Sequence, residues 1–440
     1  MSSDPAARAG ATLAIDLAGI VANWRLLCTR AAPAQCAAVI KGNAYGLGAT
    51  PVARALAAAG CRMFFVASLD EGIALRQALG NEPEIAVLNG PMTGTAPEFI
   101  ENGLIPVLNT PEQIAEWAGL ASRVLRDAPL QGAPQDEGHS WMASEYDPHP
   151  EEAAERPSRR THRRVSETWQ RAQRTAGVSP ADAAGTAAVR ETSRAQAILH
   201  VDSGMARLGL TADEFTDLMA DPPPIAWRAV MSHLACADSP DHEFNQRQRA
   251  RFAAIAAQLP GVCASLAASS GIFLGPDYHF DLVRPGAALY GVNPLPGRPN
   301  PLRQIVRLSA KILQIRQIDR GESVGYGAAH VMEAPGRVAT VAIGYADGWL
   351  RSLSHRGAGT LAGRRVPLVG RVSMDLVTFD VSAVPAELAH PGATIELLGV
   401  GYGVDDAAAD AGTIGYEILT ALGARYHRVY RGSSVTKRAE

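Results

Sequence analysis

Short apolar runs alternate with amphipathic helical patterns along the first two-thirds of the chain. Each run has the length and the even hydrophobicity of a strand that is buried on both faces. The helical patterns carry start signals, because Ser68, Thr95 and Thr211 each stand three residues before a glutamate, as in a capping box. The pattern predicts eight strands: Cys36–Ile40, Met63–Ala67, Glu84–Leu88, Ile105–Leu108, Ala197–Asp202, Arg228–Leu234, Val262–Ala267 and Phe280–Arg284.

This alternation of strands and helices predicts an α/β fold. Eight parallel strands, each followed by a helix, are typical of a closed (β/α)8 barrel of the TIM type, which we expect over residues 12–295. An open doubly wound sheet is the alternative, because the number of strands counted in one sequence is easily wrong by one.

The composition and the hydrophobic pattern of the chain change after Tyr290. Proline and glycine are frequent in "GVNPLPGRPNP", which is typical of a linker, and the following segments alternate apolar and polar positions as strands do. The sequence therefore predicts a second, mostly β domain over residues 300–438, with one late helix near Tyr416–Leu422.

Residues 127–193 fit neither domain. This segment is rich in proline, has few regularly spaced apolar residues, and carries an acidic cluster followed by a basic one that includes Arg159 and Arg163. The basic cluster alone could be an arm that binds nucleic acid, but the adjacent acidic residues favour a solvated, low-complexity insertion between the fourth and fifth strands of the barrel.

Composition narrows the class of protein. The chain has 47% hydrophobic and 19% charged residues and a formal net charge of −3, so we expect a globular protein without nucleic acid as a partner. No apolar run is long enough to span a membrane, and Asp4 and Asp16 do not fit a secretory signal. The five scattered cysteines predict neither a disulfide framework nor a metal site, and the sequence as a whole predicts a cytoplasmic protein.

Lys41 is the first candidate for chemistry. It follows the first predicted strand in "AVIKGNAYGLG", and the carboxyl ends of barrel strands are where catalytic groups gather. An isolated lysine is usually a solvated surface charge. A lysine that leaves a buried strand is partly desolvated, however, and the lowered pKa frees its amine as a nucleophile that can form a Schiff base.

Small residues at the same end of the predicted barrel are suited to a phosphate. Ser269, Ser270 and Gly271 follow the seventh strand and Gly286 follows the eighth, which are the loops where barrels commonly bind a phosphate group. A lysine that forms an imine and a phosphate site in one barrel suggest pyridoxal 5'-phosphate as the cofactor.

Eight motifs resemble a known family. They are "AVIKGNAYGLG", "DSGMARLG", "SHLACAD", "RPGAALYG", "SVGYGA", "IGYADGWLRS", "GRVSMDLVTFDV" and "TIGYE", and they extend over almost the whole chain outside residues 127–193 and the termini. In this order they resemble the fold-type III pyridoxal-phosphate amino-acid racemases, above all the alanine racemase family.

The resemblance implies a role for each matched residue. Lys41 would hold the cofactor and act as acid or base on one face of the substrate Cα, and Tyr326 of the partner subunit in a homodimer would act on the opposite face. His233 would hydrogen bond to Tyr326, and Arg207 would contact the cofactor and the substrate carboxylate. The implied cofactor-binding residues are Lys41, Tyr45, Ser270, Arg284, Gly286, Ala287 and Tyr416. The implied substrate-binding residues are Arg207, Tyr345, Met374 and Asp375.

The function implied by the resemblance is that of an isomerase that interconverts L-alanine and D-alanine and supplies D-alanine for peptidoglycan. The alternatives are a broad-specificity racemase that acts on serine or lysine, a barrel decarboxylase of basic amino acids, and a single-domain barrel that only holds the cofactor. The last two lack the second-domain motifs found here. One position departs from the family pattern, because His200 stands where the family often carries a lysine that orients the arginine.

Overall fold

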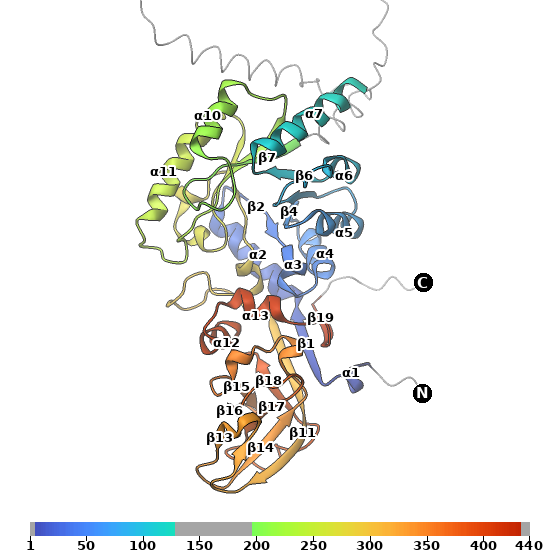
Figure 1. Cartoon of the computed structure of the whole chain (residues 1–440), viewed down its shortest axis with the longest axis vertical. Helices are drawn as coiled ribbons and strands as arrows, with labels where there is room; N and C mark the ends of the chain where they lie inside the picture. Colours follow the sequence, from blue (N-terminus) through green and yellow to red (C-terminus); the bar gives the residue numbers. More distant parts are fainter. Residues whose placement is uncertain (1–4, 128–195, 433–440) are drawn as a thin grey trace, which may run out of the picture.

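The structure, a computed structural model, describes residues 5–127 and 196–432. In Figure 1 the described residues from Leu17 to Tyr290 form the upper part of the molecule, and the first strand together with most of the later residues forms the lower part. The predicted insertion at residues 127–193 lies, apart from its first residue, outside the described residues. No helix of the described ranges is long and apolar enough to cross a membrane.

The upper part is a barrel of parallel strands. Seven strands are hydrogen bonded in chain order, and an eighth, β10 (Leu282–Val283), pairs in parallel with β2 (Gln35–Cys36). The Arg284 N–H also donates to the carbonyl of Ala267 beyond β9, so β10 closes the ring. The other strands are β3 (Ala38–Val39), β4 (Met63–Val66), β5 (Glu84–Val87), β6 (Ile105–Leu108), β7 (Gln196–His200), β8 (Ala226–Met231) and β9 (Cys263–Ser265). The predicted α/β class and (β/α)8 barrel are confirmed.

The barrel helices lie outside the strands, as Figure 1 shows. They are α2 (Leu17–Ala31), α3 (Lys41–Tyr45), α4 (Ala49–Ala58), α5 (Leu69–Leu79), α6 (Ala96–Glu101), α7 (Pro111–Asp127), α10 (Ala212–Ala220) and α11 (Phe244–Ala256). The predicted capping box is complete at Thr211. It is absent at Thr95, whose hydroxyl instead donates to the carbonyl of Met92, so that prediction was wrong.

The lower part contains a mostly antiparallel sheet of eight strands. Their order is β14-β17-β16-β15-β18-β11-β1-β19, and β14 also pairs with β11. The strands are β1 (Ala11–Asp16), β11 (Val306–Ile318), β14 (Gly336–Val341), β15 (Ala358–Leu361), β16 (Arg364–Val369), β17 (Val377–Asp380), β18 (Thr394–Leu398) and β19 (His427–Arg431). Two helices, α12 (Val404–Ala411) and α13 (Gly415–Ala421), face the barrel, and α13 is the predicted late helix.

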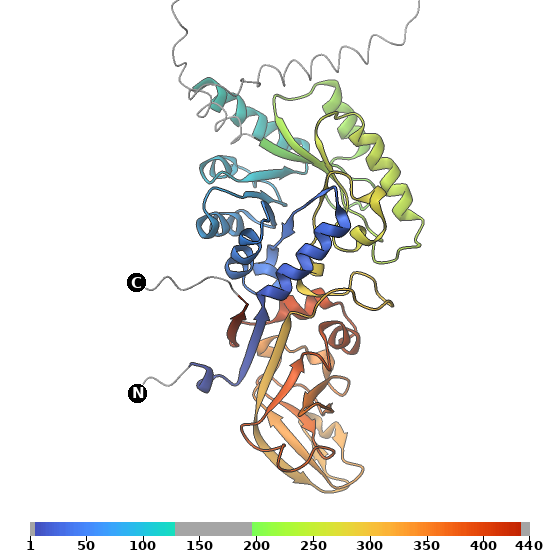
Figure 2. The same ribbon diagram turned by 180° about the vertical axis from the view of Figure 1, so that it is seen from behind.

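Strand β1 belongs to the lower sheet although it precedes the barrel in the sequence. It pairs antiparallel with β11 and parallel with β19, and Figure 2 shows it running beside β11 before the chain enters α2. The predicted division at 12–295 and 300–438 assigned these residues to the barrel, because a local apolar pattern does not show which distant strand it pairs with. The other limits of that division stay a prediction.

Candidate active site

A cavity of about 960 Å³ opens at the carboxyl ends of the barrel strands. Its walls come from the loops after most of the strands and from α12 and α13 of the lower part. The predicted site residues that line it are Lys41, Tyr45, Arg207, His233, Ser270, Arg284, Gly286 and Tyr416. The structure therefore brings together residues that are far apart in the sequence, and barrel and lower domain both contribute to one site.

Lys41 begins the short helix α3, directly after the first barrel strand. The next four residues, from Gly42 to Tyr45, have φ between 54° and 62°, a left-handed conformation that is unfavourable for residues other than glycine. The Glu71 carboxylate stabilises this turn by accepting hydrogen bonds from the N–H groups of Gly42 at 2.6 Å and Asn43 at 3.2 Å. Sequence reasoning read Glu71 only as a helix cap and missed this contact, which no local pattern reports.

The environment of Lys41 favours a reactive amine. Partial desolvation at the cavity wall lowers the pKa of its ammonium, the positive charge of Arg207 lowers it further, and Glu71 opposes the change. The backbone of Lys41 is fixed by α3, while its side chain reaches the cavity. A free amine near neutral pH is what nucleophilic attack on a carbonyl requires.

The wall of the cavity beside the first barrel strand is built from small residues and hydroxyl groups. The Ser269 hydroxyl accepts hydrogen bonds from the N–H groups of Gly286 at 3.0 Å and Ala288 at 3.2 Å, which fixes the loop after β10. A methyl group on Gly286 would overlap the Tyr45 hydroxyl, so glycine is needed for this close approach. Ser270 begins a short 3-10 helix beside this loop, and the predicted Ala287 is buried next to Gly286.

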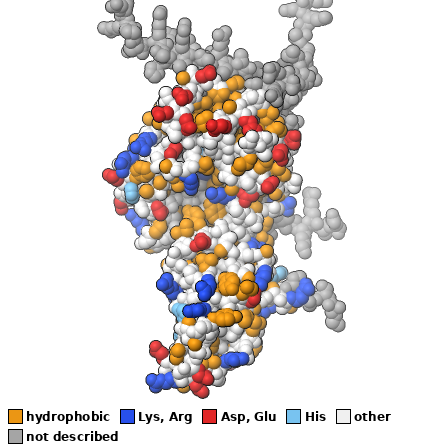
Figure 3. All heavy atoms as spheres, viewed as in Figure 1, with side chains coloured by type: hydrophobic (Ala, Val, Ile, Leu, Met, Phe, Trp, Pro, Cys, Tyr) orange, Lys and Arg blue, Asp and Glu red, His pale blue; other side chains and the backbone are white. Residues whose placement is uncertain are grey.

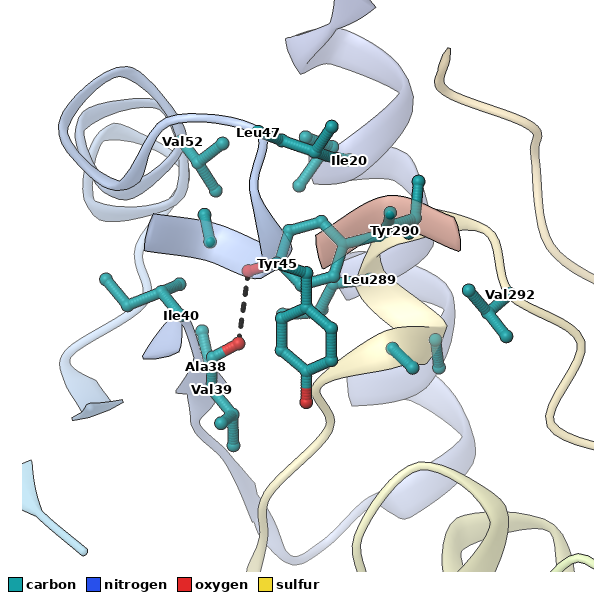
Figure 4. Packing of buried hydrophobic residues seen from close by; sticks show 14 of the residues in the cluster. Ile20, Ala38, Val39, Ile40, Tyr45, Leu47, Val52, Leu289, Tyr290 and Val292 are labelled. Carbon is teal, nitrogen blue, oxygen red and sulfur yellow. Dashed lines mark hydrogen bonds between the residues drawn. The ribbon is translucent and has the colours of Figure 1, made fainter. Parts of the chain in front are cut away.

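Tyr45 and Tyr416 bring two phenols to this wall, from the barrel and from α13. Their ring centroids are 5.9 Å apart, and burial raises the pKa of both hydroxyls, so both stay protonated and can donate hydrogen bonds. The Tyr290 ring packs against the Tyr45 ring with 4.8 Å between the ring centroids, and the Tyr290 hydroxyl donates to the carbonyl of Val39 at 3.1 Å. Figure 4 shows the rings of Tyr45 and Tyr290 side by side among buried side chains from the first and the last segments of the barrel.

Arg284 is a buried cation at the floor of the cavity. Its Nη1 donates to the Ser265 hydroxyl and its Nη2 donates to the carbonyl of Ser232 at 2.6 Å. Burial lowers its pKa to about 10, so the guanidinium remains charged at neutral pH. Two contacts to the barrel fix its orientation, and a group that faces it meets a permanent positive charge.

His233 and Arg207 complete the part of the site that one chain supplies. Burial, followed by the charges of Arg284 and Arg207, lowers the pKa of His233 to about 3, so this imidazole is neutral although one edge opens on the cavity. Arg207 is exposed and forms no hydrogen bond or ion pair with the described residues. It is therefore available to bind an anion.

Four predicted residues lie outside this cavity, in the lower domain. Tyr326 is 72% exposed, Tyr345 43% and Met374 53%. The Tyr345 N–H donates to the carbonyl of Ser373, and the Asp375 carboxylate accepts from Arg425 at 2.8 Å, so contacts within the chain hold these loops. Figure 3 shows hydrophobic side chains beside Lys and Arg on the visible face of this domain. One chain alone does not bring these four residues to Lys41.

Comparisons with known proteins agree with this arrangement. Residues 15–132 and 168–294 match the family model of the alanine racemase N-terminal domain, and residues 305–430 match that of the C-terminal domain. The break in the first match falls within the predicted insertion.

The relatives cover nearly the whole chain. An alanine racemase of Rhodospirillum rubrum is 48% identical over 429 residues, with 97% of each chain covered, and a catabolic alanine racemase of Mesorhizobium japonicum is 43% identical, with 97% and 94% covered. Among solved structures, alanine racemase from Bartonella henselae with covalently bound pyridoxal phosphate aligns with a TM-score of 0.78 at 35% identity, covering 96% and 99% of the two chains. The chain belongs to the alanine racemase family.

Proposed function

We propose that this protein is a pyridoxal 5'-phosphate-dependent isomerase that interconverts L-alanine and D-alanine and supplies D-alanine for peptidoglycan. The observation that carries the proposal is the position of Lys41. A lysine with a lowered pKa opens on a cavity whose lining also offers hydroxyl groups and a glycine loop. The Bartonella henselae relative carries the same cofactor in covalent form.

The residues of the cavity fit this cofactor. Ser270 and Gly286, with the phenols of Tyr45 and Tyr416, would hold the phosphate, because neutral hydroxyl and N–H groups donate to phosphate oxygens. Arg284 would face the pyridine nitrogen. When bound, pyridoxal phosphate supplies the aldehyde that Lys41 attacks and the ring that makes the substrate Cα proton acidic.

Inversion at Cα needs one proton donor and one proton acceptor on opposite faces. Lys41 Nζ serves one face, and the Tyr326 hydroxyl of a second copy serves the other, so the same pair works in both directions. Arg207 binds the substrate carboxylate from within the barrel, and His233 supports the phenol. Tyr345, Met374 and Asp375 of the second copy line the approach to the site.

The permanent charge of Arg284 has a chemical consequence. Arg284 keeps its protons, so it would leave a pyridine nitrogen held against it unprotonated, and the bound ring would withdraw electrons less strongly. This would favour return of a proton to Cα over transfer of the amino group.

The exposed position of Tyr326 supports a homodimer. The side chain is largely exposed, and Met374 and Leu376 of the same domain expose 53% and 41% of their surface. A second copy that covers these residues would complete two equivalent sites. We further propose that the dimer acts in the cytoplasm, consistent with the five cysteines all being free thiols.

The test is a mixed dimer of Lys41→Ala and Tyr326→Phe chains, co-expressed with different tags and purified through both. Each parent homodimer is expected to be inactive. The mixed dimer contains one site with both Lys41 and Tyr326, so it should show about half of the wild-type activity per dimer. A mixed dimer of Lys41→Ala and Lys41→Arg is the matched control and should stay inactive.

An inactive mixed dimer of the first kind would mean that Lys41 and Tyr326 act within one chain, or not together. Formation of the D-enantiomer from L-alanine, L-serine and L-lysine, measured separately on the wild-type protein, tests the substrate. A rate with serine or lysine equal to that with alanine would replace the proposal by the broad-specificity alternative.

A further inference from the structure

His200 is a buried histidine at the carboxyl end of β7, and no step of the proposed reaction uses it. Its side chain lines the cavity although only 7% of the residue is exposed. Its Nδ1 lies 2.7 Å from Oδ1 of Asn109, which follows β6. Asn109 at the end of the neighbouring strand therefore fixes the ring, and the tautomer of His200 depends on whether Asn109 accepts or donates this hydrogen bond.

The orientation of the Asn109 amide is fixed by its surroundings. Its Nδ2 lies 3.1 Å from the carbonyl oxygen of Leu88 and 2.9 Å from that of Val107, and both are acceptors only. The amide nitrogen must face these two oxygens, so Oδ1 faces His200. The Gln113 side chain holds the same residue by accepting from its backbone N–H at 2.8 Å.

This arrangement selects one tautomer of His200. An oxygen at Oδ1 accepts only, so Nδ1 of His200 carries the proton and donates it. Burial, followed by the charges of Arg284 and Arg207, lowers the pKa of His200 to about 4, with Asp202 opposing them. The Asp202 carboxylate accepts hydrogen bonds from the N–H groups of Gly204 and Met205. At neutral pH the ring is neutral and Nε2 is a bare acceptor.

The Nε2 atom opens on the cavity. No described residue donates to it, and it is not among the four buried side-chain atoms that lack both solvent and a partner. The loop that carries Arg207 folds over this ring, because the Leu210 N–H donates to the His200 carbonyl at 2.9 Å and the Gly209 backbone packs against the ring edge. Arg207 thus stands on a loop that is anchored to His200 and has no partner of its own among the described residues.

We propose that Asn109 and His200 form a positioning element in which the neutral imidazole presents Nε2 as the acceptor that orients the Arg207 guanidinium toward the substrate carboxylate. The proposal rests on the proposed function, because it assigns the carboxylate of that reaction to Arg207. His200 acts through Arg207 and does not contact the reacting atoms.

The first measurement is independent of activity. Histidine labelled with ¹⁵N is incorporated in the wild-type holoenzyme, and NMR distinguishes protonated from bare ring nitrogens. We expect one histidine with protonated Nδ1 and bare Nε2 that does not titrate between pH 6 and 8, and whose signals disappear in His200→Gln. His279→Gln is the matched control, since His279 is equally buried but bonds to the carbonyl of Ile272 away from the cavity.

Asn109→Asp tests how the oxygen at Oδ1 selects the His200 tautomer without changing the size of the side chain, and it also removes the two hydrogen bonds from Nδ2 to the carbonyls of Leu88 and Val107. A carboxylate at this position stabilises the imidazolium, so His200 should now titrate near neutral pH, and its protonated Nε2 can no longer accept from Arg207. The KM for L-alanine should therefore rise as the pH falls from 8 to 6 in Asn109→Asp, but not in the control Asn102→Asp, whose half-buried side chain lies outside the cavity. His200→Gln should raise this KM roughly tenfold with a smaller change in kcat.

Protonated Nε2 in the wild-type protein, or a His200→Gln enzyme with unchanged KM, would overturn the proposal. If His200→Gln does not fold, the pH dependence of Asn109→Asp decides. A wild-type protein that does not racemise alanine would refute the proposed function, whereas the NMR result would still report the state of His200.

Discussion

Arg428 connects the lower domain to the helix that carries Lys41, and its removal should loosen that helix. The side chain lies in β19, and its Nη1 donates to the carbonyl of Gly46 at 2.5 Å, directly after α3. Its Nη2 donates to the carbonyls of Gly423 at 3.0 Å and Leu422 at 3.3 Å, directly after α13. One guanidinium therefore holds together the ends of two helices that line the cavity.

The magnitude follows from these contacts. Hydrogen bonds from a charged donor contribute about 1.5–3 kcal/mol each when buried. The three bonds do not add in full, because two of them share one nitrogen, the longest is weak, and water can hydrate the half-buried carbonyls in part. We therefore expect Arg428→Met to lower the free energy of local opening by about 2 kcal/mol. A change of this size corresponds to amide exchange roughly 30 times faster at α3 and α13.

Hydrogen exchange followed by mass spectrometry measures this change on peptides that cover residues 41–48 and 415–423. Arg431→Met, at an exposed position of the same strand, is the control and should leave both peptides unchanged. Faster exchange should be accompanied by weaker binding of pyridoxal phosphate, because Lys41 and Tyr416 are then less well positioned. Unchanged protection of both peptides in a folded Arg428→Met protein would refute the assignment of Arg428 as the connection.

Three further predictions concern the cavity. Burial holds His233 and His200 neutral with pKa values of about 3 and about 4, so both take up protons on unfolding at a pH below their ordinary pKa of about 6.5. The free energy of unfolding should therefore decrease as the pH falls from 6.5 to 4, by up to about 1.4 kcal/mol per pH unit for each group. His233→Gln should make this pH dependence weaker in urea titrations of the apoprotein. Gly286→Ala should weaken cofactor binding at least tenfold by its overlap with Tyr45, and Tyr45→Phe in the same chain should restore part of the affinity, measured by cofactor absorbance; an additive loss would contradict this. Arg284→Glu should increase the keto acid formed by transamination, and its absence from the products of a folded variant would count against the role given to this charge.

The sequence predicted the barrel well because its signals are local. Each strand was read from four to seven consecutive residues, and β4 and β6 are indeed buried at every position. The capping prediction at Thr211 is confirmed for the same reason, since the partners lie within one turn. At Thr95 the same local rule was wrong, because the backbone of Thr95 is helical and not extended, and the Glu98 N–H donates to the Thr95 carbonyl instead of to its hydroxyl.

The candidate site could be predicted only in part. The strand ends placed Lys41, Arg207, His233 and Arg284 in one cavity, because parallel strands bring their carboxyl ends to one side. Contacts between distant segments, such as Glu71 with the turn after Lys41 or Arg428 with Gly46, have no sequence signature. The position of Tyr326 stays a prediction, because it depends on a second chain.

The position of β1 constrains when the lower domain can be completed. Thr12 pairs with Ser309 on one side and with His427 on the other, so a segment made at the start of synthesis is flanked by one made roughly 400 residues later. The barrel can close as soon as its last strand leaves the ribosome, but the sheet below it must wait for β19. A product that ends before β19 would leave one side of β1 unpaired, so this sheet is finished only after residues 427–431 have been made.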